Sequence, residues 1–403
     1  MTHLTSTAGQ TDLPRWFARA FDTLCGIRAG TIDIELPDGR VFRAAGPEPG
    51  PYGRIDVKDG AMFSRVVRDG EIGFSEAFMD GQWDTPDLQS LLDVLLLNND
   101  EIGRQTPGMA LVRVWERINH LLRRNSKVQA KKNISYHYDL GNDFYSLWLD
   151  DTMSYSSAIF TEPQQSLEDA QTAKYASMCD QIGVKPGDHI LEIGCGWGGF
   201  AEYAAKERGA RVTGLTISKE QHDYAVERIR RAGLEGQVEI ALRDYRDETG
   251  TYDGIASIEM FEAVGERYWP AYFDSVRERL KPGAKGTFQI ITIADRLFPE
   301  YRKGVDFIQK YIFPGGMLPS MSALREQVAK ADLAEVTNIE FGQSYSETLR
   351  RWHETFNAKW DEISAQGFDD RFRRMWNFYL TSCAATFQQR TTDVVQLTVT
   401  RPR

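Results

Sequence analysis

The 403-residue chain is poor in cysteine, in long apolar runs and in net positive charge. Its four cysteines are scattered without the spacing of a disulfide framework or a metal site, so we expect no bound metal and a reducing compartment. Nowhere do about 18 apolar residues follow one another, the length that a membrane-spanning helix needs. Residues 1–7 lack the charged and apolar regions of a secretory signal peptide, which favours a cytoplasmic location.

Positive charge is in deficit because 48 basic residues face 58 acidic ones, a formal net charge of −10. A chain of this sign repels the nucleic-acid backbone, so we expect no nucleic-acid partner. One segment differs: five of the ten residues 123–132 are Lys or Arg. Residues 123–135 are therefore either a solvated basic linker or a cationic strip that approaches anionic lipid headgroups, and the two interpretations are compatible.

The length allows two domains, and residues 1–122 are predicted to form the smaller one, of α+β type. Apolar and polar residues alternate over 30–42 around a Pro-Asp-Gly turn, which predicts a β-hairpin. We expect a loop over 47–51. Helices are expected over 62–67, 72–79 and 88–97, the last of them buried because nearly every position in it is apolar.

Residues 136–403 are predicted to form an α/β catalytic domain, because strand and helix patterns alternate from residue 180 onward. Repeated βαβ units imply a parallel sheet with helices on both faces. We expect a helix over 368–389 and then an antiparallel edge strand over 394–400. The other strands are expected at 189–193, 210–215, 238–242, 253–258 and 285–293, and the other helices at 199–208, 219–233 and 267–280.

A glycine-rich stretch, residues 189–200, organises this domain. A short apolar strand is followed by four glycines between 194 and 199, and then by a helix. Glycine lets the backbone turn tightly and approach a ligand, as in the nucleotide-binding crevice of a parallel sheet. The acid that dinucleotide-binding folds carry about 20 residues further on is missing. The stretch resembles motif I of class I S-adenosylmethionine (SAM) methyltransferases, with Glu192 ahead of the glycines; the alternative is a turn that binds nothing.

Polar side chains follow the next two predicted strands, where a nucleotide would lie. Thr216 and Gln221 stand where many SAM enzymes use an acid to hold the ribose hydroxyls, and Ser218 is the expected N-cap of the helix. Asp244 follows the third strand and is expected to meet the adenine amino group. Ahead of the sheet, dense aromatic and polar residues at 136–145 and 153–160 predict a cap over the cofactor. The alternative is an amphipathic packing helix, which would not explain the polar cluster at 154–157.

Two carboxylates, Glu259 and Glu262, follow the fourth predicted strand. They lie three residues apart and share a face if the chain turns helically there. They form either a solvated pair or a negatively charged pair that stabilises positive charge near the cofactor. Aromatic residues are dense from 301 to 379, but we expect most of them in the core and single out only Tyr345.

Together these residues indicate a resemblance to the cyclopropane fatty acyl phospholipid synthases and the related mycolic acid cyclopropane synthases. The resemblance runs from about residue 15 to the end of the chain. It includes residues 78–84, which are similar to the lipid-docking domain of the long bacterial members. The other matching stretches are 138–143, 153–157, 191–199, 214–221, 260–262, 310–320 and 345–349.

The resemblance implies a Rossmann-like SAM-dependent methyltransferase that acts on unsaturated acyl chains of phospholipids. A methyl group adds to the double bond, and a bound bicarbonate removes a proton from the carbocation so that a cyclopropane ring closes. For the bicarbonate pocket it implies Glu262, Tyr345 and Ile293. The SAM contacts that it implies are Tyr155, Ser156, Gly194, Gly196, Thr216 and Gln221.

Three positions depart from the pattern of the family. Ser157 stands in place of the pocket cysteine, Ile291 in place of its histidine, and Ala263 in place of the histidine that commonly follows the glutamate. Isoleucine removes a polar partner that a buried anion needs, so bicarbonate loses a ligand here. We therefore expect Ser157, Glu262 and Tyr345 in the catalytic group, with Glu262 or Glu259 as the replacement base.

Two products follow from these departures. The chain either makes a cyclopropane ring or leaves a methylated alkene, which a partner oxidoreductase could reduce to a methyl branch. We expect a peripheral protein at the inner surface of the cytoplasmic membrane, with a homodimer among the arrangements that the family uses. Two other classes compete. A liposome-dependent rate would exclude a methyltransferase for soluble molecules or nucleic acids, and SAM binding would exclude a lipid-binding protein without catalysis.

Overall fold

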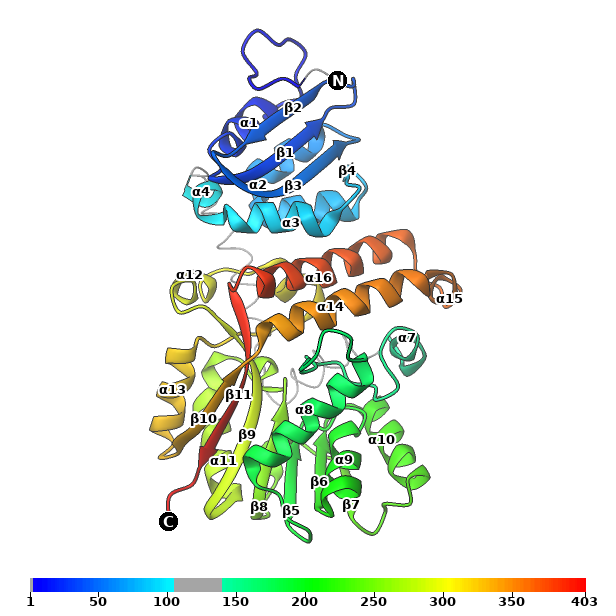
Figure 1. The fold of residues 1–403 in the computed structure, drawn as a ribbon, viewed down its shortest axis with the longest axis vertical. Coiled ribbons are helices and arrows are strands. Elements are labelled where there is room, and N and C mark those ends of the chain that lie inside the picture. Colours follow the sequence, from blue (N-terminus) through cyan, green and yellow to red (C-terminus); the bar gives the residue numbers. More distant parts are fainter. Residues whose placement is uncertain (1–2, 105–139) are drawn as a thin grey trace.

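The computed structural model describes residues 3–104 and 140–403. Two sheets organise these residues, one of four strands near the N-terminus and one of seven strands in the rest of the chain (Figure 1). The predicted basic linker at 123–135 and the first residues of the predicted catalytic domain lie outside the described residues. The division into domains at 122 and 136 therefore stays a prediction.

The N-terminal sheet contains the predicted hairpin, in which Ile32 pairs with Ala44 in antiparallel register. The loop predicted over 47–51 is wrong, because Pro49 and Pro51 lie within a strand that pairs in parallel with the first. A register shift opposite these prolines lets the ladder do without their missing N–H groups. In the order β2-β1-β3-β4, the strands are β1 Ala29–Glu35, β2 Val41–Ala45, β3 Glu48–Val57 and β4 Trp83–Asp84.

Four helices accompany this sheet within residues 3–104. The helices predicted over 62–67 and 72–79 are two halves of one element, which kinks at Gly70, where φ is 59°. The helix predicted over 88–97 has the predicted bounds, and Asp87 caps it by accepting a hydrogen bond from Ser90 N. The helices are α1 Phe17–Leu24, α2 Ala61–Met79, α3 Leu88–Leu97 and α4 Asn99–Arg104.

All the strands predicted for the large sheet are present, and the α/β class is confirmed. The last strand is antiparallel as predicted, but it is not the edge, because the unpredicted strand 334–340 pairs with its outer side. Six of the seven residues of that edge strand are exposed, so no buried alternation marks it in the sequence. The strands are β5 His189–Ile193, β6 Arg211–Thr216, β7 Val238–Leu242, β8 Tyr252–Ile258, β9 Leu280–Ile293, β10 Ala334–Glu340 and β11 Thr392–Thr400, in the order β10-β11-β9-β8-β5-β6-β7.

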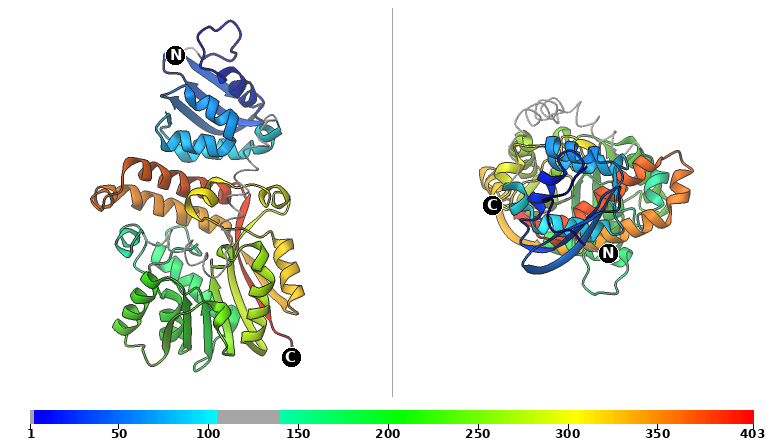
Figure 2. Two further views of the ribbon diagram at one scale, coloured as in Figure 1. Left: turned by 180° about the vertical axis from the view of Figure 1, so that it is seen from behind. Right: turned by 90° about the horizontal axis from the view of Figure 1, so that it is seen from above.

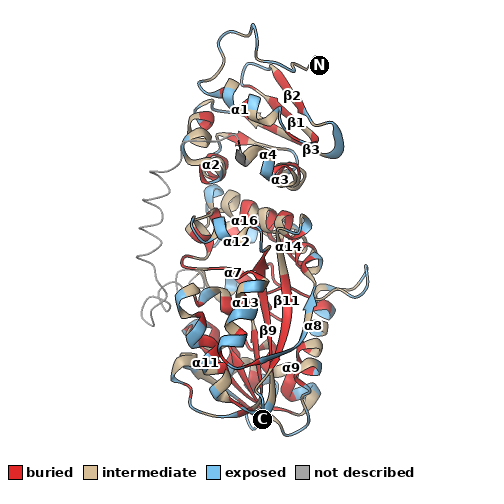
Figure 3. Ribbon diagram, turned by 90° about the vertical axis from the view of Figure 1, so that its left-hand side faces the viewer, coloured by how far each residue is buried: buried red, intermediate tan, exposed pale blue. Residues whose placement is uncertain are grey.

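Helices cover both faces of the large sheet, as Figure 3 shows nearly edge-on. On one face lie α8 Leu167–Ile182, α9 Gly199–Arg208 and α10 Lys219–Arg231, and on the other α11 Trp269–Arg279 and α13 Met321–Lys330. The helix predicted over 267–280 is split, since a 3₁₀ turn precedes α11. The short elements are α7 Asn142–Ser146, η1 Tyr245–Asp247, η2 Phe261–Ala263, η3 Glu266–Tyr268, α12 Phe298–Tyr301 and the π-helix η4 Ile308–Ile312.

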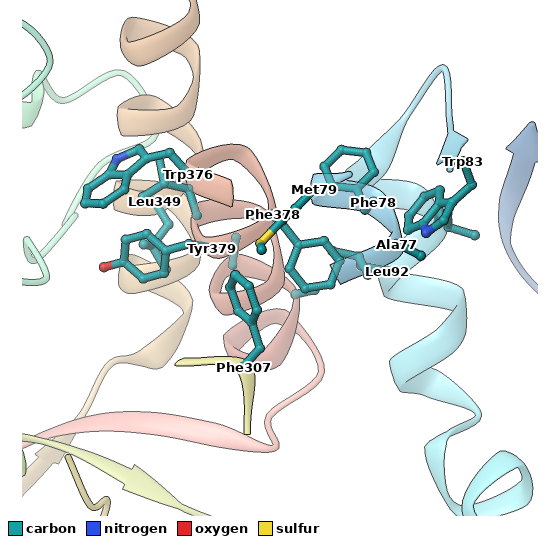
Figure 4. Packing of buried hydrophobic residues seen from close by; sticks show 14 of the residues in the cluster. Ala77, Phe78, Met79, Trp83, Leu92, Phe307, Leu349, Trp376, Phe378 and Tyr379 are labelled. Atoms are coloured by element: carbon teal, nitrogen blue, oxygen red, sulfur yellow. The ribbon is translucent and has the colours of Figure 1, made fainter. Parts of the chain in front are cut away.

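A helical layer separates the two sheets (Figures 1 and 2). It consists of α14 Gly342–Ala358, α15 Trp360–Ser364 and α16 Asp370–Gln388. Phe378 of α16 packs against Phe78 of α2 and Phe307, with ring centroids 5.8 and 4.9 Å apart (Figure 4). Because these contacts continue into both parts of the chain, one hydrophobic cluster joins the N-terminal sheet to the helical layer.

The order of the large sheet fixes where a ligand can bind. From β5 the chain proceeds to β6 and β7 on one side, then crosses to β8 and β9 on the other. The loops after β5 and β8 therefore diverge at a topological switch point, the position at which open α/β sheets bind ligands. The glycine-rich turn and the two carboxylates predicted from the sequence both follow these strands.

Candidate active site

The glycine-rich turn has backbone conformations that residues with a side chain rarely adopt. Gly194, Gly196 and Gly198 have φ values of 83°, 52° and 84°. A Cβ on Gly194 would fall 2.7 Å from Met260 Cγ, so that glycine allows close packing. A Cβ on Gly196 would meet nothing within 4 Å in the part of the chain that the structure describes. Gly196 thus borders open space beside the turn.

Glu192 is the penultimate residue of β5, just before this turn, and is buried. Among residues 3–104 and 140–403, its Oε2 has no hydrogen-bond partner. Burial raises the pKa of the Glu192 carboxyl to about 8, against the attraction of Lys174 and Arg228. A buried carboxyl oxygen without a partner fits a ligand at the turn that offers it a hydrogen-bond donor.

The residues predicted for the ribose lie together at the end of β6. Thr216 Oγ1 donates to Gln221 Oε1 at 3.0 Å, and both side chains are buried. Ser218 caps α10 as predicted, since its Oγ accepts a hydrogen bond from Gln221 N. Asp244 caps η1 and accepts two hydrogen bonds from the Arg246 guanidinium, at 2.8 and 2.5 Å. Its contact with adenine stays a prediction.

The segment predicted as a cap lies against helix α8. Ser156 is held twice: Lys174 Nζ donates to its Oγ at 2.7 Å, and Gln171 Nε2 donates to its carbonyl oxygen at 3.0 Å. Lys174 has no exposed surface, and burial lowers the pKa of its ammonium group to about 8. Helix α8 therefore fixes the residue next to Tyr155 and places a cation behind it.

Tyr155 stands within aromatic walls that come from four parts of the chain. Its hydroxyl lies 2.7 Å from that of Tyr379 on α16. The surrounding rings have centroids between 5.4 and 6.3 Å from that of Tyr155, close enough for ring faces to line one space. They belong to Tyr145, Trp148, Phe313 and Trp352.

Glu259 is the centre of the polar part of the site. Its Oε1 accepts hydrogen bonds from Ser157 N at 2.7 Å and from Gln289 Nε2 at 2.8 Å. Its Oε2 accepts one from Tyr345 OH at 2.7 Å. Burial raises the pKa of Glu259, and these donors oppose the rise because they stabilise the ionised form. Two of the three residues predicted as catalytic, Ser157 and Tyr345, thus meet on this carboxylate.

Glu262, the third predicted catalytic residue, lies apart from that group, in η2. Its Oε1 accepts a hydrogen bond from the backbone N–H of Ile291 at 2.5 Å. Its Oε2 is buried without a hydrogen-bond partner among the residues that the structure describes. Burial and the neighbouring Glu259 raise the pKa of Glu262 to about 8, so it carries a proton at neutral pH.

Two residues of the site were not singled out from the sequence. Gln289 lies between the apolar residues Phe288 and Ile290 in β9, and that position alone could have pointed to it. Lys174 gave no such signal, because a lysine on a surface helix is ordinary and only tertiary packing buries this one. The Ser157 Oγ donates to the carbonyl oxygen of Ala158, while the backbone N–H of Ser157 donates to Glu259.

The described residues contain no group of three or more metal-ligating side chains, and all four cysteines are free. No helix in the described part of the chain has the length and apolarity needed to cross a membrane.

A glycine turn at the switch point of a seven-stranded α/β sheet, with a buried acid ahead of it, defines a class I SAM-dependent methyltransferase. The family model for mycolic acid cyclopropane synthetase matches residues 125–397. The chain belongs to this family.

Relatives with assigned functions agree with this assignment. The chain is 39% identical to the tuberculostearic acid methyltransferase UfaA1 of Mycobacterium tuberculosis, over 92% of this chain and 88% of the relative. It is 38% identical to the cyclopropane-fatty-acyl-phospholipid synthase of Escherichia coli K12, over 86% of this chain and 87% of the relative. These similarities show that the chain is a SAM-dependent methyltransferase that modifies lipids.

Solved structures agree with the fold. The cyclopropane synthase MmaA2 of Mycobacterium tuberculosis matches with a TM-score of 0.63 and 29% identity, over 67% of this chain and 98% of that one. The mycolic acid cyclopropane synthase CmaA1, in complex with SAH and CTAB, matches with a TM-score of 0.63 and 28% identity over the same shares. The predicted methyltransferase fold is therefore confirmed.

Proposed function

We propose that this enzyme transfers a methyl group from SAM to the double bond of an unsaturated acyl chain in a membrane phospholipid. When bound, SAM supplies an electrophilic methyl group, and its addition to the alkene leaves a carbocation on the acyl chain. The aromatic walls around Tyr155 support this chemistry, because ring faces stabilise a cation in an apolar space. The names of the relatives support the substrate class.

The residues around the glycine turn are suited to hold SAM. Gly196 leaves room for close approach of the cofactor, and Gly194, where Met260 packs against the turn, is the second proposed backbone contact. The unpartnered Glu192 oxygen would accept a hydrogen bond from the polar end of the cofactor. Tyr155 and Ser156 would close over it from the other side. The remaining proposed contacts are Thr216 and Gln221 for the ribose and Asp244 for the adenine.

The observation that carries the mechanism is the cradle of three donors around Glu259. Ser157 and Tyr345, which the family resemblance assigns to the bicarbonate pocket, already give their hydrogen bonds to this carboxylate. These donors would not be available to a separate bicarbonate ion, because they already bond to Glu259. We infer that the Glu259 carboxylate replaces bicarbonate and accepts the proton that the carbocation loses, while Glu262 holds its own proton.

The proposed product is a methylated alkene. Loss of a proton from the carbocation re-forms a double bond when the C–H electron pair moves onto the cationic carbon. A cyclopropane ring is the second candidate, favoured by the 38% identity to a cyclopropane synthase, and it forms if the transferred methyl loses the proton and closes onto the cationic carbon. Reduction of the alkene to a methyl branch would need an oxidoreductase partner.

The product can be read from the lipids of a host that makes monounsaturated phospholipids and expresses the chain. Mass spectrometry should show a gain of one CH₂ per acyl chain, and proton NMR of the isolated ester should show that olefinic signals remain. Cyclopropyl signals in place of olefinic ones would establish the second candidate. A Gly196→Asp variant is the control, and expression of the intact chain without any gain of CH₂ would overturn the proposal.

We further propose that the N-terminal part docks on the bilayer as a peripheral domain. A turnover rate that rises with anionic phospholipid vesicles, compared with the same lipid in detergent, would support this location. A rate equal in both would contradict it.

A further inference from the structure

Three glutamines stand in series behind Glu259, on three different elements. Gln289 on β9 and Gln396 on β11 are direct partners in the antiparallel register, so their side chains share a face of the sheet. Both are fully buried, with exposed fractions of 1% and 0%. Gln181, at the end of α8, continues the series. Buried amides need all their hydrogen bonds satisfied, which makes each contact informative.

The direction of the first amide is fixed by its neighbours. Gln289 Nε2 donates to Glu259 Oε1 at 2.8 Å and to the carbonyl oxygen of Ser157 at 3.1 Å. A backbone carbonyl can only accept, and so can an ionised carboxylate, so the amide nitrogen must face both. The Gln289 oxygen then points the other way and accepts from Gln396 Nε2 at 3.1 Å.

The same logic passes to the next two amides. Because Gln396 donates through its nitrogen, its oxygen is left to accept from Gln181 Nε2 and Ser177 Oγ, both at 2.6 Å. The Gln181 oxygen accepts from the hydroxyls of Thr337 and Thr398, each at 2.9 Å. The series therefore runs in one direction, from hydroxyl donors at the edge of the sheet to the Glu259 carboxylate.

We propose that Gln396 is a positioning residue for the reaction, because it donates to the Gln289 oxygen and so supports the orientation in which Gln289 donates to Glu259. This inference rests on the proposed role of Glu259 as the base. Without Gln396, the Gln289 oxygen loses its hydrogen-bond donor, and the donation from Gln289 to Glu259 weakens. A carboxylate that loses a donor holds its proton more tightly, so Glu259 becomes a base only at higher pH.

Other charged and titratable groups also act on Glu259, and they stay in place when Gln396 is changed. Lys174 from α8 attracts its negative charge, the neighbouring Glu262 from η2 repels it, and Tyr345 from α14 donates to it. A purely structural role for the glutamines would stabilise the sheet without moving the pH at which Glu259 ionises. The pH profile of turnover separates the two roles.

The test is the pH dependence of kcat for wild type and for Gln396→Met, with SAM and monounsaturated phospholipid vesicles. We expect the acid limb to move up by about one pH unit, with kcat about tenfold lower on that limb, recovery at high pH and little change in KM. Gln289→Leu should move the limb similarly, and the double variant Gln289→Leu/Gln396→Met should add nothing further. Asn98→Leu, which removes an equally buried and bonded amide in the N-terminal part, should lower stability without moving the limb.

An unmoved acid limb in Gln396→Met, or an equal extra shift in the Gln289→Leu background, would overturn the inference. If Gln396→Met does not fold, Gln181→Met, at a half-buried position, loosens the same series and should give a smaller shift in the same direction. Glu259→Gln separates this inference from the mechanism beneath it. If that variant keeps wild-type turnover, the base assignment fails; if it is inactive while the limb stays put in Gln396→Met, only the positioning role fails.

Discussion

At the scale of single residues, the backbone of Glu259 is under strain that its side chain explains. Its φ of 49° lies in the left-handed region, which costs a residue with a Cβ about 1–3 kcal/mol. Such strain persists where surrounding contacts hold it, and here three hydrogen bonds hold the carboxylate. This backbone conformation, just after the end of β8, directs the Glu259 side chain toward Ser157 and Tyr345.

A pair of matched variants tests which glutamate accepts the proton. Glu259→Gln should lower kcat by at least about 100-fold, since an amide is not a base and general base catalysis contributes that much or more. Glu262→Gln should keep most of the turnover at pH 7, because an amide mimics the protonated Glu262 carboxyl. Turnover assays at saturating SAM measure both effects. A severe loss of turnover in Glu262→Gln would show that Glu262 is the base instead.

The two raised carboxyl pKa values also predict how stability depends on pH. Glu192 and Glu262 ionise near pH 4.5 when unfolded and near pH 8 when folded, so the folded state binds more protons between these values. Stability should therefore fall as pH rises from about 5 to 8, by up to about 1.4 kcal/mol per pH unit for each group. Urea denaturation at several pH values should show a shallower fall in Glu262→Gln, and an identical slope would contradict the raised pKa.

At the scale of elements, helix α8 connects the two halves of the site. Gln171 and Lys174 hold Ser156, while Ser177 and Gln181, further along the same helix, bind Gln396. The helix has little amphipathic contrast, because buried polar residues interrupt its apolar face. It serves as a rigid support for the proposed cofactor side and base side together.

Replacing Lys174 by Met tests the cofactor side of this support. The variant removes the hydrogen bond to Ser156 Oγ and the buried cation, so we expect SAM to bind about tenfold more weakly, a loss near 1.4 kcal/mol. Isothermal calorimetry with SAM gives the value directly. Lys185→Met, just beyond the same helix on the surface, is the control and should bind as wild type does. Equal SAM affinity in Lys174→Met would show that this support does not act on the cofactor.

Elements differ in how far the sequence predicts them, for physical reasons. The strands β5 and β8 are predictable because they are buried parallel strands in which most positions are apolar. The exposed edge strand β10 leaves no such pattern, and the prolines of β3 imitate a loop. The glycine turn is local and could be predicted, but the partners of Glu259 come from β9, α14 and the segment at 157, so only the fold brings them together.

At the scale of the whole molecule, helix α16 is a wall shared by both parts. Phe378 packs against Phe78 of α2 in the N-terminal part (Figure 4). The hydroxyl of the next residue, Tyr379, lies 2.7 Å from that of Tyr155 in the site. Arg374 adds polar contacts to the first face, donating to the carbonyl oxygens of Phe78 and Trp83. The residue of α16 that contacts the N-terminal part, Phe378, is therefore adjacent in sequence to Tyr379, which lines the active site.

Arg374→Ala tests how strongly the two parts are joined. It leaves two backbone carbonyls without their donor and removes a cation over the Phe78 ring, so we expect a loss of about 2–3 kcal/mol in the free energy of unfolding. Turnover should fall with it, because the neighbouring α16 residues loosen. Arg371→Ala is the matched control, since its ion pair with Asp80 is solvent-exposed and worth less than about 1 kcal/mol. Denaturation curves that coincide for the two variants would argue against a tight junction.

The shared wall also limits how this enzyme can be rebuilt. The cyclopropane synthases MmaA2 and CmaA1 match 67% of this chain over 98% of their own length, so a catalytic part without the N-terminal part occurs in the family. Truncating this sequence to that length would expose Phe378 and Phe307 to solvent. The exposed apolar patch would promote self-association. The N-terminal part therefore cannot be exchanged freely. A chimera must keep the face of α16 that contacts the N-terminal part together with that part, or replace the apolar side chains of this face by polar ones.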